Sequence, residues 1–359
     1  MTCYHQPLRN ILPLLISVCL LYACSNESQH QGSSDSTKTE KTITKETWPT
    51  PGDSSLLTVA AIRSSANQQG IDLLFNERAA IYHYEGDTNS PSGLYQSARS
   101  AFRKKQPLYV FIDVLKKKIR NFRVANLKEL KSFHFSQQSI VNSLAPIKLG
   151  VKKPDSLRFS KVISQRYFRS VFDCTNVVPD MTTAKDIFSY CSNQTCTTTG
   201  SYPYPPCIPF QYVVDGCYAR ANKMRDLIQE KYGFCCEKVF SFANKNGDEL
   251  SVKTTKWGGC CVNWWYHVAP ILRIKSTSGD LIYVIDPGMF DEPVLLLTWL
   301  QAQKDSSCNL HANVSSYSIQ PGTAYMPANY DGTAFSTDLN DTNTNVTLID
   351  YRNLKTCGN

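Results

Sequence analysis

Cysteine is distributed very unevenly along this chain of 359 residues. Of the fourteen cysteines, three lie within the first 24 residues, none lies in residues 25–173, and the other eleven lie between Cys174 and Cys357. A cysteine-dense segment in an exported chain is typical of a fold held together by disulfides. Because eleven is an odd number, at least one thiol has no disulfide partner, and a free thiol in an oxidising compartment needs a role of its own.

The first 24 residues have the pattern of an export signal. Arg9 supplies a short positive region, and the apolar run that follows, residues 11–23, is too short to span a bilayer. The run ends directly before Cys24 and resembles a bacterial lipobox, in which this cysteine receives a lipid; ordinary signal cleavage nearby is the alternative. We expect an exported outer-membrane or cell-surface lipoprotein that contacts a membrane only through its lipid anchor.

Composition and charge divide the rest of the chain. Residues 25–55 are rich in Ser, Thr, Gln, Lys and Glu, a composition that predicts a disordered tether. Residues 25–173 carry 23 basic and 13 acidic side chains, whereas residues 174–359 carry 14 and 17. A basic segment that precedes an acidic, cysteine-rich one is typical of a pro-segment docked on its own domain, and two unrelated domains are the alternative. We therefore do not interpret the net charge of +8 as a nucleic-acid surface.

Hydrophobic patterning predicts a mixed α+β fold in both halves. In the first half, residues 79–84 and 108–112 are rich in aromatic and β-branched side chains and predict strands. Residues 93–105 between them predict a helix. A second helix is predicted at 126–135, with Asn126 as its cap.

In the second half, a helix and a strand pair frame the residues of interest. Asp215-Gly216 is a turn signal, and apolar residues recur at helical spacing after it, so Cys217 is predicted at a helix N-terminus. Residues 264–274 predict a buried strand. A turn at 276–280 and a returning strand at 281–285 complete a hairpin.

Three residues could form a nucleophilic site. A cysteine thiolate is favoured at a helix N-terminus or beside an imidazolium, and Cys217 has the first of these. The cysteine-rich segment holds only two histidines, of which His267 lies in the strongest strand and His311 in a polar stretch. Asp286 ends the returning strand, where it could hold the tautomer of His267. Taken alone, each residue also has a structural interpretation, as a disulfide half, a core histidine and a turn former.

The other cysteines indicate disulfides rather than a metal site. Adjacent cysteines at 235–236 and 260–261 lack the two-residue gap of zinc knuckles, so we predict neither a metal nor a cofactor. Without Cys217, ten cysteines remain, enough for five disulfides. The spacing of Cys196 and Cys207 suits a local loop, and Cys236 with Cys260 or Cys261 is a plausible second bridge.

Several motifs, in the right order, resemble the bacterial protein glutaminases, also called protein deamidases. The resemblance covers roughly residues 175–330 and extends more weakly into 70–135. The matching stretches are Val214-Asp215-Gly216-Cys217-Tyr218-Ala219-Arg220-Ala221-Asn222-Lys223-Met224-Arg225, Cys260-Cys261-Val262-Asn263-Trp264-Trp265-Tyr266-His267-Val268-Ala269, Ile285-Asp286-Pro287, Val178-Pro179-Asp180 and Val314-Ser315-Ser316-Tyr317. The lipobox, Cys174, Cys191, Cys235 and an unmatched cysteine near Cys308 depart from the family pattern.

The resemblance implies an α+β fold with a transglutaminase-like or papain-like core. Its domains would be a signal peptide (1–24), a tether (25–55), a small α+β pro-domain (56–173) and a catalytic domain (174–359). The implied activity is hydrolysis of glutamine side chains in proteins or peptides, by Cys217, His267 and Asp286. The pro-domain would act as an intramolecular inhibitor until an activating protease cuts near residues 165–176, which could also release the catalytic domain from the cell.

The resemblance also suggests weaker assignments. Gln211 lies six residues before Cys217, the offset that papain-like proteases use for an oxyanion glutamine, although a surface glutamine is the commoner case. Trp264, Trp265 and Tyr266 could line the substrate cleft, and core packing is the alternative. A transglutaminase-like acyltransferase, a cysteine protease and a non-enzymatic surface lipoprotein remain the competing functions.

Overall fold

Alternation of buried and exposed side chains builds the first sheet. Every second residue of β5 (Leu108–Asp113) is buried, the pattern of a strand with one covered face. The sheet has the strand order β1-β5-β6-β4-β3-β2 and is antiparallel except where β4 meets β6. Its other strands are β1 (Ser54–Leu57), β2 (Val59–Ser64), β3 (Ile71–Phe75), β4 (Ile81–Tyr84) and β6 (Lys118–Val124).

The predicted helices of this half are confirmed where they can be seen. α1 (Leu94–Lys104) follows its N-cap Gly93 and ends at the left-handed Lys105, as predicted for residues 93–105. Asn126 caps a second helix, because its side chain accepts from the Glu129 N–H while the Glu129 carboxylate accepts from the Asn126 N–H. That helix is described only as far as residue 131.

The computed structural model describes residues 54–65, 70–86, 93–131, 177–196, 206–244, 247–253, 255–277 and 279–357. The predicted export signal with Cys24 and the predicted cut at 165–176 lie outside the described residues. So does the predicted tether, except that β1 already begins at Ser54. We call residues 54–131 the N-terminal segment and residues 177–357 the C-terminal segment; both belong to one compact unit, residues 48–359.

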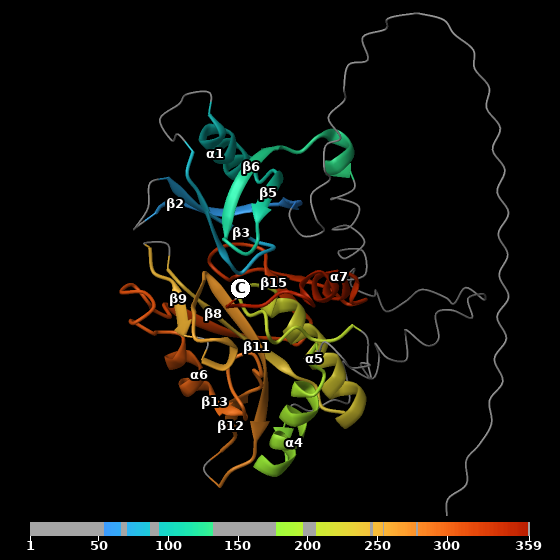
Figure 1. Ribbon diagram of the computed structural model, residues 1–359. Helices are drawn as coiled ribbons and strands as arrows, with labels where there is room; N and C mark the ends of the chain where they lie inside the picture. The colour runs from blue at the N-terminus through green and yellow to red at the C-terminus, as the bar shows by residue number, and fades with distance from the viewer. Residues whose placement is uncertain are drawn as a thin grey trace, which may run out of the picture. The chain divides into compact units, whose positions relative to one another are not determined.

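A second, mainly antiparallel sheet forms the centre of the C-terminal segment (Figure 1). β11 (Tyr266–Ile274) is almost continuously buried, because it pairs with strands on both sides and α5 (Cys217–Tyr232) packs against it. The order is β13-β12-β11-β8-β14, with β7 parallel to β11. The other strands of this sheet are β7 (Val177–Val178), β8 (Glu237–Phe242), β12 (Leu281–Val284), β13 (Val294–Leu295) and β14 (Ser316–Gln320).

Shorter elements complete the C-terminal segment. α4 (Met181–Ser192), capped by Asp180, packs on α5, and so does α7 (Thr342–Tyr351). The remaining elements are β9 (Leu250–Lys253) paired with β10 (Cys261–Trp264), β15 (Ala324–Pro327) paired with β16 (Phe335–Thr337), the 3-10 turn Thr255–Trp257 and α6 (Leu296–Ala302). The predicted α+β class is confirmed. No helix within the described ranges is both long and apolar enough to cross a membrane.

The disulfide predictions are confirmed only in part. Cys196–Cys207 forms as predicted. The predicted pairing of Cys236 with Cys260 or Cys261 is wrong, because these two neighbours pair instead with residues far along the chain. The long-range bridges are Cys260–Cys357 and Cys261–Cys308.

The ten cysteines other than Cys217 cannot form five disulfides, because two of them are free. Cys191, Cys217 and Cys236 are free and buried, and Cys235 is disulfide-bonded. Cys236 lies just before β8, whereas Cys260 and Cys261 lie at the start of β10. Tertiary packing, rather than proximity along the chain, therefore sets the pairing.

Candidate active site

The N-terminus of α5 is fixed by a glycine. Gly216 has φ 75°, and a Cβ atom at this position would lie 2.8 Å from the Tyr351 ring. Glycine therefore meets both the backbone and the steric requirement. Cys217 follows as the first residue of the helix and is almost fully buried.

The hairpin brings the predicted histidine and aspartate together. His267 lies near the start of β11, and Asp286 comes two residues after the end of β12, which pairs with β11. The Nε2 atom of His267 lies 2.9 Å from Oδ2 of Asp286, and both side chains are buried. The predicted contact between these two side chains is thus present.

Two indole rings hold the imidazole between them. The Trp264 ring stacks on His267 with ring centroids 4.5 Å apart, and the Trp299 ring stacks at 5.3 Å. Trp299 Nε1 also donates to Oδ2 of Asp286 at 2.9 Å. Trp299 was not among the residues predicted from the sequence, since α6 is short and no spacing connects it to Asp286.

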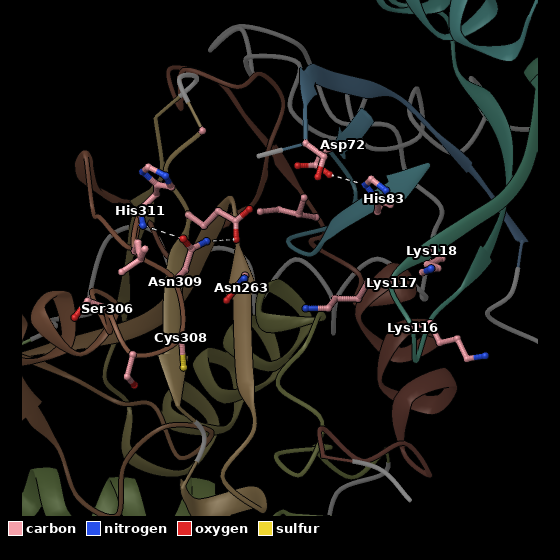
Figure 2. Close-up of a pocket in the computed structure, with 16 residues that line it drawn as sticks. Asp72, His83, Lys116, Lys117, Lys118, Asn263, Ser306, Cys308, Asn309 and His311 are labelled. Atoms are coloured by element: carbon pink, nitrogen blue, oxygen red, sulfur yellow. Dashed lines mark hydrogen bonds and ion pairs between the residues drawn. The ribbon is translucent and has the colours of Figure 1, made fainter. Parts of the chain in front are cut away.

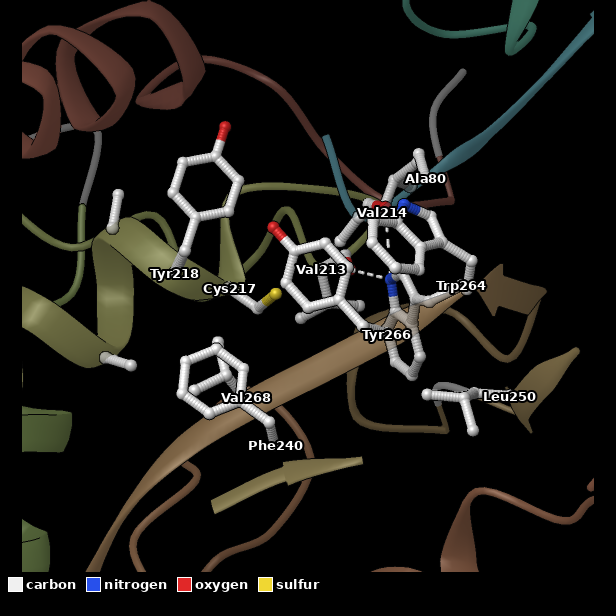
Figure 3. Packing of buried hydrophobic residues seen from close by; sticks show 14 of the residues in the cluster. Ala80, Val213, Val214, Cys217, Tyr218, Phe240, Leu250, Trp264, Tyr266 and Val268 are labelled. Atoms are coloured by element: carbon white, nitrogen blue, oxygen red, sulfur yellow. Dashed lines mark hydrogen bonds between the residues drawn. The ribbon is translucent and has the colours of Figure 1, made fainter. Parts of the chain in front are cut away.

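The sulfur of Cys217 lies beside the strand that carries His267. The backbone N–H of Val268, the residue after His267, lowers the pKa of this thiol. Figure 3 shows the thiol between α5 and β11, close to Tyr266 and Val268. Nδ1 of His267, the ring nitrogen that Asp286 leaves free, has no hydrogen-bond partner within the described part of the chain. The imidazole therefore keeps one nitrogen for proton transfer while Asp286 occupies the other.

Burial and charge set the ionisation of the site in opposite ways. Burial raises the pKa of the Cys217 thiol to about 12; Arg220 acts against this rise, and Asp215 adds to it. Burial also acts to raise the pKa of Asp286, but His267 and the Trp299 hydrogen bond outweigh it and hold this pKa below its ordinary value. The site thus contains an ionised aspartate and a protonated, unreactive thiol.

The weaker predictions have more varied outcomes. Gln211 donates its side-chain amide to the carbonyl of Arg352 at 2.9 Å, so its oxyanion role stays a prediction. Trp264, Trp265 and Tyr266 are fully buried. His311 is exposed, in the polar stretch where the sequence placed it. No group of three His, Cys, Asp or Glu side chains suited to a metal ion occurs among the described residues.

A loop of the N-terminal segment covers the site. The N–H of Ala79 donates to Oδ1 of Asp215 at 2.9 Å, and the carbonyl of Ala79 accepts from the N–H of Trp265 at 3.1 Å. Ala80 forms a β-bridge with Trp264. The predicted strand 79–84 therefore begins only at Ile81, because the two alanines pair with the C-terminal segment.

One cavity lies away from the catalytic candidates. It has a volume of about 480 Å³ and is lined by residues of both segments, among them Asp72, His83, Lys117, Glu249 and His311 (Figure 2). None of Cys217, His267 and Asp286 lines it. Ala79 and Ala80 are themselves fully buried.

The known proteins to which this chain is similar are glutaminases. A family model described as glutaminase matches residues 184–303. The crystal structure of a pro-protein-glutaminase is 28% identical to this chain; the match covers 84% of this chain and 93% of that one, with a TM-score of 0.61. The A47Q2 mutant of pro-protein-glutaminase is also 28% identical; that match covers 84% of this chain and 94% of the mutant chain, with a TM-score of 0.61. The NMR structure of protein-glutaminase from Chryseobacterium proteolyticum is 37% identical, covers 51% of this chain and 93% of its own, and has a TM-score of 0.44.

No curated protein matches the sequence. The match to the pro-protein-glutaminase extends beyond the C-terminal segment, because it covers 84% of the chain. The family model spans the helix with Cys217 and the strand pair with His267 and Asp286. The resemblance seen in the sequence motifs is thereby confirmed, and this chain is an amide-hydrolysing enzyme that belongs to the protein glutaminase family.

Proposed function

We propose that the chain is the precursor of an enzyme that hydrolyses the side-chain amide of glutamine in proteins, with Cys217, His267 and Asp286 as a catalytic triad. One observation carries this proposal. A buried cysteine at a helix N-terminus lies beside the strand that carries a histidine, and the Nε2 atom of this histidine is paired with a buried aspartate. Such an arrangement serves thiol-based acyl transfer.

The reaction runs in two steps. The Cys217 thiol gives its proton to Nδ1 of His267, and the sulfur attacks the carboxamide carbon of the glutamine side chain. His267 returns the proton to the leaving nitrogen, so ammonia departs and a thioester remains. Water then attacks the thioester as His267 takes up its proton, and the products are glutamate and the free thiol.

Each group has a physical reason for its role. Asp286 orients His267 and stabilises its cationic form, because their contact is buried and short. The backbone N–H of Cys217 has no intrahelical acceptor at the start of α5 and is the natural donor to the oxyanion. These roles fit a transglutaminase-like or papain-like core.

The N-terminal segment is proposed to be an inhibitory pro-domain. Its loop at Ala79 and Ala80 pairs with Trp264 and Trp265, and Cys217 is buried in this closed form. A protein substrate cannot reach the thiol while these contacts persist. Activation then follows a cut near residues 165–176 by another protease.

Export is part of the same proposal. Disulfides at Cys196–Cys207, Cys260–Cys357 and Cys261–Cys308 are typical of oxidising compartments. We propose a surface lipoprotein anchored at Cys24, from which the processed catalytic domain is released. Mass spectrometry of the membrane fraction should find the N-terminal cysteine acylated, and an N-terminus elsewhere would contradict the anchor.

The reaction type is tested with the full-length chain after limited proteolysis and removal of the protease. We expect ammonia release from a glutamine-rich protein whose chain stays intact on a gel, with mass increases of about 1 Da per converted residue, as conversion of amide to acid requires. A labelled primary amine should not be incorporated. Incorporation would indicate a transglutaminase, and new N-termini would indicate a protease.

Trp299 provides a test of the electrostatics. The Trp299→Phe variant keeps an aromatic ring beside His267 but removes the donor to Asp286, so the pKa of Asp286 should rise. The carboxylate is then protonated at a higher pH as the solution is acidified. We expect the acidic limb of the kcat/KM profile to move up by about one pH unit, the effect of one hydrogen bond to a charged group.

The matched control is Trp257→Phe, which removes an indole donor to the neutral carbonyl of Gly288. Its acidic limb should stay where it is. Equal shifts in both variants would show that the effect comes from packing rather than from the carboxylate.

A further inference from the structure

Arg220 is a buried cation on the helix that begins with Cys217. The residue is 3% exposed, and its Nη1 atom donates to the carbonyl of Tyr212 at 2.7 Å and to that of Asp215 at 2.6 Å. Unlike Arg225, which pairs with Asp226, Arg220 forms no ion pair with a carboxylate in the described part of the chain. A buried charge whose partners are all neutral is costly to a fold. Its presence here therefore indicates a function.

The spacing along α5 places Arg220 beside the proposed nucleophile. Residues three apart on a helix are neighbours, and Arg220 comes three residues after Cys217. The two carbonyls that hold the guanidinium belong to the stretch that leads into the helix, so the positive charge lies at the end of α5 that Cys217 begins. Both bonds are made within the C-terminal segment and do not depend on the N-terminal segment.

The charge of Arg220 acts on the two groups of the site that are anionic during the proposed reaction. Burial raises the pKa of the Cys217 thiol to about 12, and Arg220 is the strongest of the interactions that oppose this rise. Burial also acts to raise the pKa of Asp286; His267 contributes most to holding this pKa below its ordinary value, and Arg220 adds to that effect. Departure of the N-terminal segment weakens the effect of burial but leaves Arg220 in place.

Other ionisable side chains face the thiol and its neighbour Asp215. They come from α5, β11, the stretch after β12, α7 and the N-terminal segment: Tyr218, Tyr266, His267, Asp286, Tyr351 and Arg78. Burial raises the pKa of the thiol, and Asp215 and Asp286 act in the same direction. Arg78 pairs with Asp215 and departs with the N-terminal segment. Among the described residues of this set, Arg220 is thus the permanent cation that stays beside Cys217.

We propose that Arg220 is the fixed counter-charge of the Cys217 thiolate, held in place by the carbonyls of Tyr212 and Asp215. This assignment rests on the proposed function, because it adds a positioning residue to the same site. The guanidinium keeps its own proton throughout. It acts through Cys217, by stabilising the thiolate that forms when the thiol passes its proton to His267.

The test measures the pKa of Cys217 directly. The full-length chain is cut by limited proteolysis, and alkylation of Cys217 by iodoacetamide is followed by mass spectrometry over a range of pH. Arg220→Gln removes the charge but keeps an amide donor for the carbonyls. We expect the pKa of Cys217 to rise by about one unit in this variant, so alkylation at a pH below the pKa slows about tenfold. Arg220→Lys keeps the charge and should leave the pKa nearly unchanged.

The matched control is Arg273→Gln, which removes an arginine charge from the far end of the strand that carries His267. Its Cys217 pKa should equal that of the unsubstituted chain. If Arg220→Gln does not fold, Arg220→Met fills similar space without a charge and replaces it in the comparison.

The outcomes separate this proposal from the proposed function. No rise in the Cys217 pKa of the uncharged variant, an equal rise in Arg220→Lys, or an equal rise in Arg273→Gln would each overturn the role of Arg220. Ammonia release by the unsubstituted cut chain is measured in parallel, and its absence would overturn the proposed function whatever the alkylation shows.

Discussion

Cys217→Ser in the proteolytically cut protein should reduce ammonia release to background, a loss of at least about 10³-fold, as for removal of other catalytic nucleophiles. The hydroxyl of serine is far less acidic than a thiol, and His267 with Asp286 would have to activate it in a site arranged for sulfur. Binding of the substrate does not use the sulfur, so the variant should still bind protein substrates.

The chain supplies its own controls for this experiment. Cys191 and Cys236 are also free and buried, and burial raises the pKa of each thiol. Serine at either position changes the same atom in a comparable environment but lies outside the proposed triad. Both variants should keep most of the activity once folding is verified. A Cys217→Ser enzyme with more than a tenth of normal activity would refute the nucleophile.

Thiol labelling checks the same residue without any substitution. Burial raises the pKa of Cys217 to about 12 in the covered chain, so only about one thiol in 10⁴ is ionised at pH 8. An alkylating reagent should therefore modify the folded precursor very slowly. After the cut, Cys217 should be labelled first and activity should disappear in parallel.

Local patterns allowed the sequence to predict the parts of the site. The Asp215-Gly216 turn signal predicted Cys217 at the start of a helix. In the structure, Gly216 in the left-handed conformation is the N-cap from which this helix begins. The hairpin pattern placed His267 and Asp286 on paired strands, which brings their side chains within 2.9 Å. Both inferences depend on short-range backbone geometry, which a sequence encodes directly.

Contacts between distant segments could not be predicted in this way. Cys260 and Cys261 were assigned a partner close in sequence, yet their bridges span 97 and 47 residues. Trp299 reaches Asp286 only because α6 follows β13 at the edge of the sheet. Ala79 belongs to a stretch, residues 79–84, whose composition predicts a strand. Only the tertiary structure shows that Ala79 pairs with another segment.

The uncut precursor should have less than about 1% of the activity of the cut protein. A tethered segment has an effective concentration of roughly millimolar, so even a micromolar affinity would leave about one molecule in 10³ open. The contacts around Ala79, together with a buried ion pair, supply this affinity. High activity in a precursor that remains intact on a gel would contradict the proposal.

The ion pair offers a way to open the precursor without cutting it. Arg63 of the N-terminal segment contacts Glu249 of the C-terminal segment and Asp72 of its own sheet, and all three side chains are largely buried. Arg63→Ala removes the cation that Glu249 and Asp72 share, at a cost of about 3 kcal/mol or more in the closed form. We expect the uncut variant to be at least about tenfold more active than the uncut parent, because 1.4 kcal/mol already changes the open fraction tenfold.

Arg120→Ala, which removes an exposed pair with Asp113 inside the N-terminal segment, should leave the low activity of the uncut precursor unchanged. A rise in the activity of both uncut variants would mean that the N-terminal segment had unfolded. No rise in activity of uncut Arg63→Ala would show that the main-chain contacts at Ala79 keep the precursor closed without the ion pair.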